Sequence, residues 1–451
     1  MAKTARETAL FILERCRRSN AFSDALLGSA VKTSELSPKD AALCTRLCYG
    51  VLQNAALCDF YIDHYSQGKA SKIEPKVRDI LRLSVYQILF LTKIPPHAAV
   101  SEGVELCKKS GFGRASGFVN AVLRKISAER EHLPQIPKND FYEYLSIKYS
   151  TPKELVRVLC QDLGNDFTEN FLAASNSEAL TSLQVNTLKI TTDELLERLS
   201  ANGISVKQHD YLPNCLELEG TGDIATLSEF NDGLFYVQDA AARMAVLAAA
   251  PKPGDKVLDA CAAPGGKSFA AAIMMQNKGS ITSCDLHDNK LSRIESGAAR
   301  LGIDCIKTHV FDASHADKAF YESFDLVIAD VPCSGLGVIR KKPDIRYKSA
   351  EDIMSLPKTQ LAILSSVSNC VKPGGVLIYS TCTVLPRENE DIIRAFLEKD
   401  SRFSLESFTL PQPIGKVEGG MLSLYPQTHG TDGFFIAKLR ALESHRRNHE
   451  S

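Results

Sequence analysis

The sequence predicts a multidomain fold: an all-α helical bundle over residues 1–135, a small α+β domain over 140–232 and an α/β domain over 233–440. Three observations predict it. The chain has 451 residues, and domains of about 100–200 residues each give two to four of them. Apolar residues recur at helical spacing through the N-terminal part. After Gly233, short apolar strands alternate with helical segments, as in a parallel sheet that helices cover on both faces.

The first domain is predicted to be helical throughout because it contains several helix-start signals. Ser37 is a capping residue, Pro38 suits the first helical position, and Asp40 adds an acid to the first turn. Pro75 opens a further segment with a wide apolar stripe. The predicted helices are Thr4–Arg18, a run from Pro38, a run from Pro75 to Pro95, a run from His97, and Ala115–Ile126.

The second domain is predicted from a mixture of helical and alternating patterns that follows a linker at Leu133–Pro137. Thr191 and Glu194 have capping-box spacing at the start of a helix, and Gly203 ends that helix. The predicted elements are the helices Pro152–Leu163 and Thr192–Ala201 and the strands Ser182–Leu188, Ile204–Gln208 and Cys215–Glu219. Together they indicate a small α+β unit.

The third domain is predicted from five short, mostly apolar strands: Lys256–Asp259, Ser280–Asp285, Ile306–Asp312, Asp325–Asp330 and Gly375–Ser380. Strands that are apolar throughout are typical of a parallel sheet buried on both faces. The chain from Leu424 to Leu439 is predicted to close the sheet as an antiparallel hairpin. Ligands of such sheets bind beyond the carboxyl ends of the strands.

The composition excludes several classes of protein. Hydrophobic residues at 44% and charged residues at 24% are ordinary globular values, which argues against a disordered or collagen-like chain. No apolar run reaches the roughly 18 residues that a membrane span needs. The first 20 residues lack the apolar block of a signal peptide. A cytoplasmic location without a membrane partner is therefore expected.

The formal net charge of −1 conceals an asymmetry. Residues 1–135 hold 20 Lys and Arg against 13 Asp and Glu, a net charge of +7. The rest holds 33 against 41, a net charge of −8. A basic block on an acidic chain suits a nucleic-acid partner, and a solvated helical surface explains it equally well.

The thirteen cysteines do not form a recognisable metal site. No C-x-x-C pair occurs, and Cys44 and Cys48 lack a partner at zinc spacing. An odd number of cysteines in a long chain is expected to consist mostly of reduced, buried thiols. No metal is predicted.

The segment after the first predicted strand of the third domain suits a nucleoside ligand without phosphates. A nucleotide-triphosphate loop would need Gly where Cys261 stands, and the G-x-G-x-x-G motif of dinucleotide sites is absent. Small residues let a ligand approach the backbone, and amides at a helix N-terminus favour a negative group. The predicted cofactor loop is Cys261, Ala262, Ala263, Pro264, Gly265, Gly266 and Lys267.

Aspartates at the ends of the next two strands extend this site. Asp285 is placed to bind ribose hydroxyls, and Asp312 to accept from an adenine amino group. Each aspartate alone could equally be a strand-end or helix-capping residue. Together with a loop that binds an amino-acid carboxylate, they describe S-adenosylmethionine.

Two cysteine motifs at the ends of later strands carry a resemblance. Asp330-Val331-Pro332-Cys333-Ser334-Gly335 and Ser380-Thr381-Cys382-Thr383, with the cofactor loop, resemble the Sun (Fmu), RsmB-type family of 16S rRNA cytosine-C5 methyltransferases. The N-terminal helical region resembles NusB, an RNA-binding protein. The resemblance implies a NusB-like bundle, a small α+β linker domain and a Rossmann-like methyltransferase domain that uses S-adenosyl-L-methionine.

The resemblance also implies roles for three residues. Cys382 would be the nucleophile that adds to cytosine C6, and Cys333 would assist release of the product. Asp330 would hydrogen-bond the cytosine edge beside the cofactor. Residue types alone do not rank the two cysteines, and either cysteine in isolation could be an ordinary buried thiol. Covalent addition is needed because cytosine C5 is too weak a nucleophile to attack a methyl sulfonium directly.

The segment that follows Cys333 adds a candidate RNA contact. Arg340, Lys341 and Lys342, followed by Arg346 and Tyr347, suit an RNA backbone beside an unstacked base. A solvated loop is the alternative.

Arg387–Glu390 is expected to cap and open the helix after Cys382. The expected partner is small-subunit ribosomal RNA, and the expected protein is a monomer. Transfer RNA as the substrate, or a non-enzymatic RNA-binding assembly factor, are the alternative functions.

Overall fold

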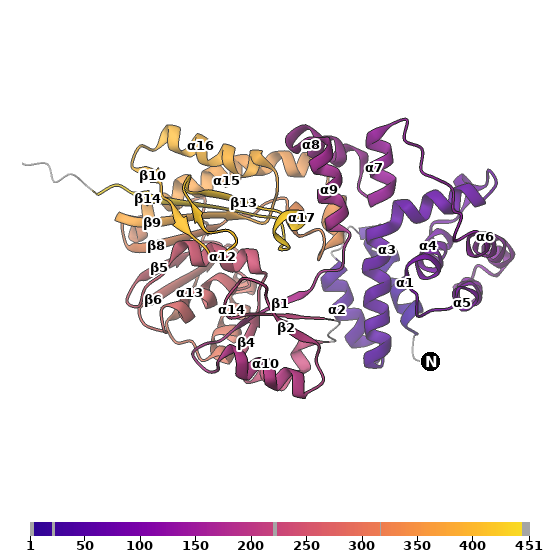
Figure 1. The fold of residues 1–451 in the computed structure, drawn as a ribbon, viewed down its shortest axis with the longest axis horizontal. Helices are drawn as coiled ribbons and strands as arrows, with labels where there is room; N and C mark the ends of the chain where they lie inside the picture. The colour runs from indigo at the N-terminus through magenta and orange to yellow at the C-terminus, as the bar shows by residue number, and fades with distance from the viewer. Residues whose placement is uncertain (1–3, 20–22, 220–222, 316, 444–451) are drawn as a thin grey trace, which may run out of the picture. The chain divides into compact units, whose positions relative to one another are not determined.

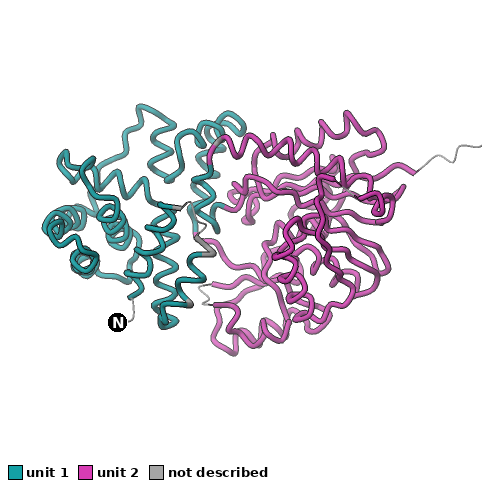
Figure 2. The backbone as a smooth tube through the Cα atoms, turned by 180° about the vertical axis from the view of Figure 1, so that it is seen from behind, with its two compact units in different colours: residues 1–177, 339–348 teal, residues 178–338, 349–451 magenta. Residues whose placement is uncertain are grey.

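A computed structural model describes residues 4–19, 23–219, 223–315 and 317–443. The chain forms two compact units (Figure 2). The first consists of residues 1–177 with 339–348, and the second of 178–338 with 349–451. The sequence predicts three domains, 1–135, 140–232 and 233–440. The division into two units does not test these boundaries, which stay a prediction.

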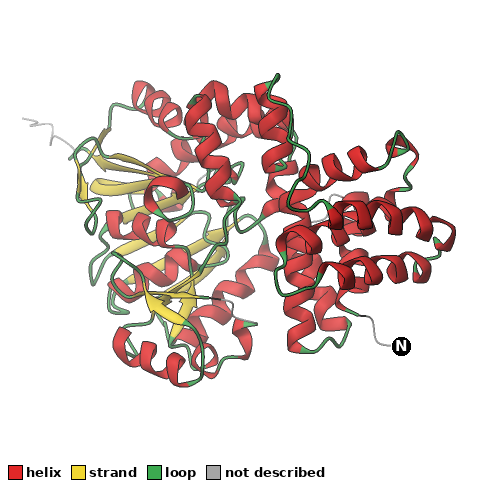
Figure 3. Ribbon diagram, turned by 45° about the vertical axis from the view of Figure 1, so that its right-hand side comes forward, coloured by secondary structure: helices red, strands yellow, loops and turns green. Residues whose placement is uncertain are grey.

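The first unit is built from helices (Figures 1 and 3), as the sequence predicts. The side chain of Ser37 accepts a hydrogen bond from the Asp40 amide, and prolines open three of the helices. The α-helices are α1 (Ala5–Ser19), α2 (Ser23–Thr33), α3 (Pro38–Tyr65), α4 (Pro75–Phe90), α5 (Pro96–Lys109), α6 (Ser116–Ala128), α7 (Phe141–Tyr149), α8 (Lys153–Leu163) and α9 (Asn165–Ser175). Residues 133–138 between α6 and α7 have no regular structure, in agreement with the predicted linker.

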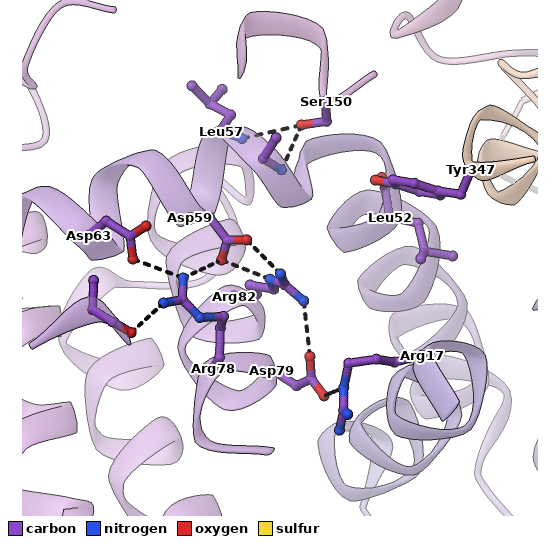
Figure 4. A network of polar contacts seen from close by, with 12 residues as sticks. Arg17, Leu52, Leu57, Asp59, Asp63, Arg78, Asp79, Arg82, Ser150 and Tyr347 are labelled. Atoms are coloured by element: carbon purple, nitrogen blue, oxygen red, sulfur yellow. Dashed lines mark hydrogen bonds and ion pairs between the residues drawn. The ribbon is translucent and has the colours of Figure 1, made fainter. Parts of the chain in front are cut away.

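Ion pairs join three of these helices (Figure 4). Arg82 on α4 contacts Asp59 on α3 and Asp79 on its own helix, the latter at 3.1 Å. Arg17 on α1 contacts the same Asp79 at 3.1 Å. The Asp79 side chain is only 3% exposed. Burial raises the pKa of Asp79, and the two arginines oppose that rise. The pairs therefore offset the cost of a carboxylate inside the bundle.

The helix α3 is kinked at Asn54, whose backbone angles are not helical. A kink leaves backbone groups of the helix without their usual partners. The Ser150 hydroxyl accepts hydrogen bonds from the amides of Ala56 and Leu57, at 3.1 and 3.3 Å (Figure 4). The carbonyl of Leu52 accepts a hydrogen bond from the hydroxyl of Tyr347 at 2.8 Å. Tyr347, in the segment 339–348, thus supplies a hydrogen-bond donor to a backbone carbonyl near the kink.

The second unit contains a small antiparallel sheet in the order β2-β3-β1-β4. Its elements are β1 (Thr181–Val185), α10 (Thr192–Ala201), β2 (Val206–Gln208), β3 (Cys215–Leu218), the short helix α11 (Ser228–Asn231) and β4 (Phe235–Val237). The capping box of Thr191 and Glu194 is confirmed. The predicted strand Ser182–Leu188 is too long. It ends at Val185 because the buried side-chain amide of Asn186 donates to the carbonyls of Gly233 and Leu301, where the chain turns.

A larger sheet in the same unit has the order β10-β14-β9-β8-β5-β6-β7, with β13 paired to β14 (Figure 1). Strands β7, β6, β5, β8 and β9 are parallel and β14 is antiparallel, as predicted for the closing hairpin. The strands are β5 (Lys256–Asp259), β6 (Ser280–Asp285), β7 (Ile306–Val310), β8 (Phe324–Asp330), β9 (Val371–Thr381), β10 (Phe403–Leu405), β13 (Met421–Leu424) and β14 (Phe434–Ala441). A separate hairpin pairs β11 (Phe408–Thr409) with β12 (Lys416–Val417).

Strands β5, β6, β8, β9 and β14 of this sheet are largely buried, and the unit also contains helices. Besides α10 and α11, these helices are α12 (Ala240–Ala249), α13 (Gly266–Met274), α14 (Asp288–Leu301), α15 (Ala350–Val367), α16 (Glu390–Lys399) and α17 (Pro426–His429). Val257 belongs to one apolar cluster and its neighbour Leu258 to another, so adjacent residues of β5 face opposite layers. The prediction of full burial is wrong for β7, which is an edge strand with a largely exposed surface and ends at Val310.

No helix among the described residues is long and apolar enough to cross a membrane.

Candidate active site

The loop that follows β5 makes a tight turn into α13. Gly265 has φ +108, and a side-chain carbon there would lie 2.5 Å from the ring of Phe269. The Ala262 amide donates to the carbonyl of Cys284 on β6 at 2.6 Å, which holds the loop against the neighbouring strand. Burial raises the pKa of the Cys261 thiol, and the acids Asp259, Asp330 and Asp285 raise it further. Cys261 is therefore a protonated thiol within the loop.

Asp259, at the end of β5, is a fully buried carboxylate that the sequence argument did not single out. It accepts a hydrogen bond from the Ser268 hydroxyl at 2.7 Å, and that hydroxyl lies 2.7 Å from the hydroxyl of Ser283 on β6. Burial raises the pKa of Asp259 to about 6. These hydrogen bonds of Ser268 connect the first turn of α13 to β5 and β6, next to the predicted cofactor loop.

Lys267 and Asp330 form a close ion pair at the carboxyl ends of the strands. Lys267 Nζ lies 2.6 Å from Asp330 Oδ2, and the other Asp330 oxygen accepts a hydrogen bond from Ser380 at 2.8 Å. Burial alone would lower the pKa of Lys267, but the pair with Asp330 raises it above its ordinary value, and Cys382 adds to that rise. Lys267 is thus a buried cation whose charge faces both Asp330 and the Cys382 thiol.

Cys333 and Cys382 lie side by side, although 49 residues separate them in the sequence. Their Sγ atoms are 3.2 Å apart, and neither cysteine forms a disulfide. The amide of Gly337 donates to the Cys382 carbonyl at 2.9 Å, which joins the loop after β8 to the loop after β9. A side-chain carbon at Gly337 would lie 1.9 Å from the Gly433 carbonyl oxygen, so only glycine permits this approach.

Cys333 and Cys382 differ in their electrostatic surroundings. The hydrogen bond with Cys382, burial, and the charges of Cys382, Glu388 and Asp330 all raise the pKa of Cys333 well above its ordinary value. Cys382, by contrast, interacts with the ammonium group of Lys267. A nearby cation stabilises a thiolate, and nearby carboxylates oppose one. The surroundings therefore oppose a thiolate at Cys333, whereas Cys382 faces the cation Lys267.

Arg387–Glu390 opens the following helix as predicted, since α16 begins at Glu390, but the expectation that it caps this helix is wrong. Asn389 precedes α16 but makes no side-chain capping hydrogen bond to it. Instead, the Asn389 amide accepts from Thr381 and donates to the Thr383 carbonyl, and the Glu388 carboxylate binds the amide of Ser334. These side chains face the cysteine loops because the chain folds back after β9, which local sequence patterns do not reveal.

Asp285 and Asp312 follow two neighbouring parallel strands. Asp285 ends β6 with a side chain that is 10% exposed, and it accepts from the His287 amide at 3.0 Å and lies 3.3 Å from Lys290 Nζ. Asp312 comes two residues after β7, and its half-exposed carboxylate accepts from the Ser314 amide and hydroxyl. Those two hydrogen bonds lower the pKa of Asp312. Both aspartates stabilise local turns after the strand ends, and their contact with a cofactor stays a prediction.

Residues 339–348, which include the predicted RNA contacts, belong to the first compact unit. The Arg340 carbonyl accepts from the side-chain amide of Gln53 at 3.1 Å. The inclusion of Arg346 among residues that face RNA is wrong. Its side chain is fully buried, and its guanidinium donates to the Tyr149 carbonyl at 2.7 Å and to Asn176 Oδ1 at 3.0 Å. The contact of Arg340, Lys341 and Lys342 with RNA stays a prediction.

Replacing Arg346 by alanine is expected to lower the free energy of unfolding by about 2–4 kcal/mol, because buried carbonyls lose their donor and a cavity forms. Urea denaturation of the full chain, followed by circular dichroism, measures this. Arg394→Ala is the matched control, since it removes only an exposed ion pair with Asp391. Equal transition midpoints for the two variants would contradict the structural role of Arg346.

Among the described residues, no group of three or more His, Cys, Asp or Glu side chains could hold a metal ion.

Comparison with known proteins agrees with this architecture. The family described as 16S rRNA methyltransferase RsmB/F matches residues 246–440. The NusB family matches residues 3–128, and a ferredoxin-like domain of RsmF/B-like methyltransferases matches residues 151–225. The predicted resemblance and the three-part fold class are thereby confirmed.

Full-length relatives support the same assignment. A protein of Bacillus subtilis (strain 168) named probable ribosomal RNA small subunit methyltransferase B is 39% identical, over 98% of this chain and 99% of its own length. One of the same name from Synechocystis is 34% identical, over 97% and 99%. The crystal structure of PH0851 has a TM-score of 0.78 at 29% identity and covers 97% of this chain and 99% of its own. The chain therefore belongs to the RsmB/F family of 16S rRNA methyltransferases.

Proposed function

We propose that the protein methylates C5 of one cytosine in 16S rRNA, with S-adenosylmethionine as the methyl donor and a covalent bond between a cysteine and cytosine C6. The observation that carries this proposal is the pair of thiols 3.2 Å apart beside the Lys267–Asp330 ion pair. A carboxylate that binds the target base would, by itself, be compatible with many kinds of methyltransferase. Two adjacent thiols at the strand ends suit a reaction that both adds and eliminates sulfur.

Cys382 is the proposed nucleophile. Its thiolate, stabilised by Lys267, adds to C6, and the electrons of the C5–C6 double bond make C5 nucleophilic. When bound, S-adenosylmethionine supplies an electrophilic methyl group to C5. A base then removes the C5 proton, the double bond re-forms, and Cys382 leaves as a thiolate.

Asp330 and Cys333 are proposed to act on the same base. Asp330 hydrogen-bonds the N3 or amino edge of the cytosine and stabilises the adduct, while Lys267 fixes the position of its carboxylate. Cys333 stays a thiol next to the carbon–sulfur bond and assists the elimination. The target cytosine must leave its stack, so the enzyme takes a flipped or single-stranded base.

The cofactor is held by the loop Cys261–Lys267 and the two aspartates. The tight approach at Gly265 and the start of α13 at Gly266 leave backbone amides to face the amino-acid end of the donor. Asp285 binds the ribose hydroxyls and Asp312 the adenine amino group. These side chains fit a donor without phosphates.

Replacing Asp285 by alanine is expected to weaken binding of S-adenosylmethionine by about 10- to 100-fold, the equivalent of a charge-assisted hydrogen bond. Isothermal titration calorimetry measures the dissociation constant directly. Asp288→Ala is the control, because this exposed residue begins α14 three positions away. An unchanged dissociation constant in Asp285→Ala would remove the ribose role.

The proposed function is tested by supplying the full chain with transcribed 16S rRNA fragments and a radiolabelled donor, and then mapping the product. The expected product is 5-methylcytidine at one position. Methyl transfer to transfer RNA instead, or RNA binding without methyl transfer, would favour the alternatives of a tRNA enzyme or an assembly factor.

A further inference from the structure

Glu388 is a fully buried carboxylate at the back of the two cysteine loops. One of its oxygens accepts from the Ser334 amide, next to Cys333, at 2.8 Å. The other accepts from the hydroxyl of Thr383, next to Cys382, at 3.1 Å. One side chain therefore contacts the immediate neighbour of each cysteine in the sequence.

A wider network fixes Glu388 itself. The side-chain amide of Gln360 on α15 donates to Glu388 at 2.8 Å and to the Pro332 carbonyl at 3.0 Å. The hydroxyls of Ser334 and Thr383 lie 2.7 Å apart, so the two loops also contact each other directly. Buried hydrogen-bond networks of this kind hold one geometry strongly.

We propose that Glu388 is a positioning residue that holds the Cys333 and Cys382 loops together and keeps Cys333 in its thiol form. The proposal extends the proposed function, because it explains how two chemically identical side chains take different roles. It rests on the proposed function for the catalytic roles of the two cysteines. The hydrogen bonds of Glu388 and the effect of its charge on Cys333 do not depend on that function.

The charged and titratable groups around Cys333 show how the charge of Glu388 acts. Cys382, Asp330 and Glu388 all raise the pKa of Cys333, in addition to burial. Tyr379 on β9 also interacts with Cys333. The cation Lys267 is paired with Asp330 and faces Cys382. Without Glu388, one of the two carboxylates that oppose a Cys333 thiolate disappears.

Glu388→Gln separates charge from position. A glutamine side chain has the same shape, can accept from the Ser334 amide with its oxygen, and can donate to Thr383 with its nitrogen. It removes the negative charge. Glu388→Ala removes both the charge and the hydrogen bonds, and leaves the Ser334 amide without its acceptor.

The charge is tested by alkylation with iodoacetamide over a range of pH, in full-length protein that carries Cys382→Ser. Mass spectrometry follows the peptide that contains Cys333. The midpoint for alkylation is expected to fall by about 1 pH unit or more when Glu388→Gln is added, as for removal of a neighbouring charge. Glu390→Gln is the control, because Glu390 binds Ser423 instead and should leave the midpoint unchanged. An unchanged midpoint in Glu388→Gln would overturn the role of the charge.

The positioning is tested with intact cysteines. Glu388→Ala is expected to lower kcat for RNA methylation by about 100-fold or more, as for a displaced catalytic group, while the dissociation constant of S-adenosylmethionine stays within about twofold. Glu388→Gln should recover most of kcat. Full activity in Glu388→Ala would overturn the positioning role. If the protein with both cysteines intact methylates no cytosine, but the alkylation shift is still observed, the proposed function is refuted and the effect of Glu388 on Cys333 stands.

Discussion

Cys382→Ala is expected to abolish methyl transfer and covalent trapping of RNA together. Without the thiolate, C5 of cytosine has no route to an enamine, so the methyl group has no nucleophile to reach. The rate should fall by at least about three orders of magnitude, in line with the loss of a covalent nucleophile in other enzymes. Single-turnover methylation of a 16S rRNA transcript and a denaturing gel for the adduct measure the two effects.

Cys305→Ala is the matched control for that experiment. Cys305 is a half-buried free thiol of the same unit and lies just before β7, at the amino end of a strand rather than the carboxyl end. This variant should methylate at the wild-type rate. Residual methylation by Cys382→Ala with a trapped adduct would mean that Cys333 is the nucleophile.

Cys333→Ala is expected to have the opposite signature, because it should accumulate the adduct. Cys382 keeps its partner Lys267 in this variant, so addition to C6 and the first methyl transfer proceed. Elimination slows without the thiol that lies 3.2 Å away. Multiple-turnover kcat should fall by about 10²- to 10⁴-fold, the usual contribution of a proton-transfer group.

The measurement for Cys333→Ala is a time course that resolves the first turnover. A burst of methylation close to one per enzyme, followed by a slow phase and a stable protein–RNA band, is expected. Loss of the burst would contradict the proposed role and assign Cys333 to the addition step.

The sequence predicted the parallel sheet well because buried strands have a simple pattern. The bounds of β5 and β6 agree with the structure residue for residue, since apolar runs end at the aspartates. For the edge strand β7, the predicted end at Asp312 lies two residues beyond the observed end, because an exposed edge strand has no pattern of burial that defines where it stops. The end of β1 could not be predicted in the same way. It depends on hydrogen bonds from Asn186 to the carbonyls of Gly233 and Leu301, which lie far away in the sequence.

The candidate site was predicted in part for a similar reason. Cys333, Cys382 and Asp330 follow strand ends, so the topology of a parallel sheet brings them to one edge. The pairing of Lys267 with Asp330 and the reach of Glu388 to Ser334 are side-chain contacts across long sequence separations, which spacing does not encode. The burial of Arg346 was missed because a cationic run resembles a solvated or RNA-binding loop until its packing is known.

The most direct test of covalent catalysis uses a 16S rRNA transcript that contains 5-fluorocytidine, the wild-type protein and S-adenosylmethionine. Fluorine at C5 cannot leave as a proton does, so the adduct persists after methyl transfer. Digestion and tandem mass spectrometry then identify the modified residue. The expected result is a methylated fluorocytidine attached to Cys382. Attachment to Cys333, or methylation of the natural transcript with no adduct from the fluorinated one, would contradict the mechanism.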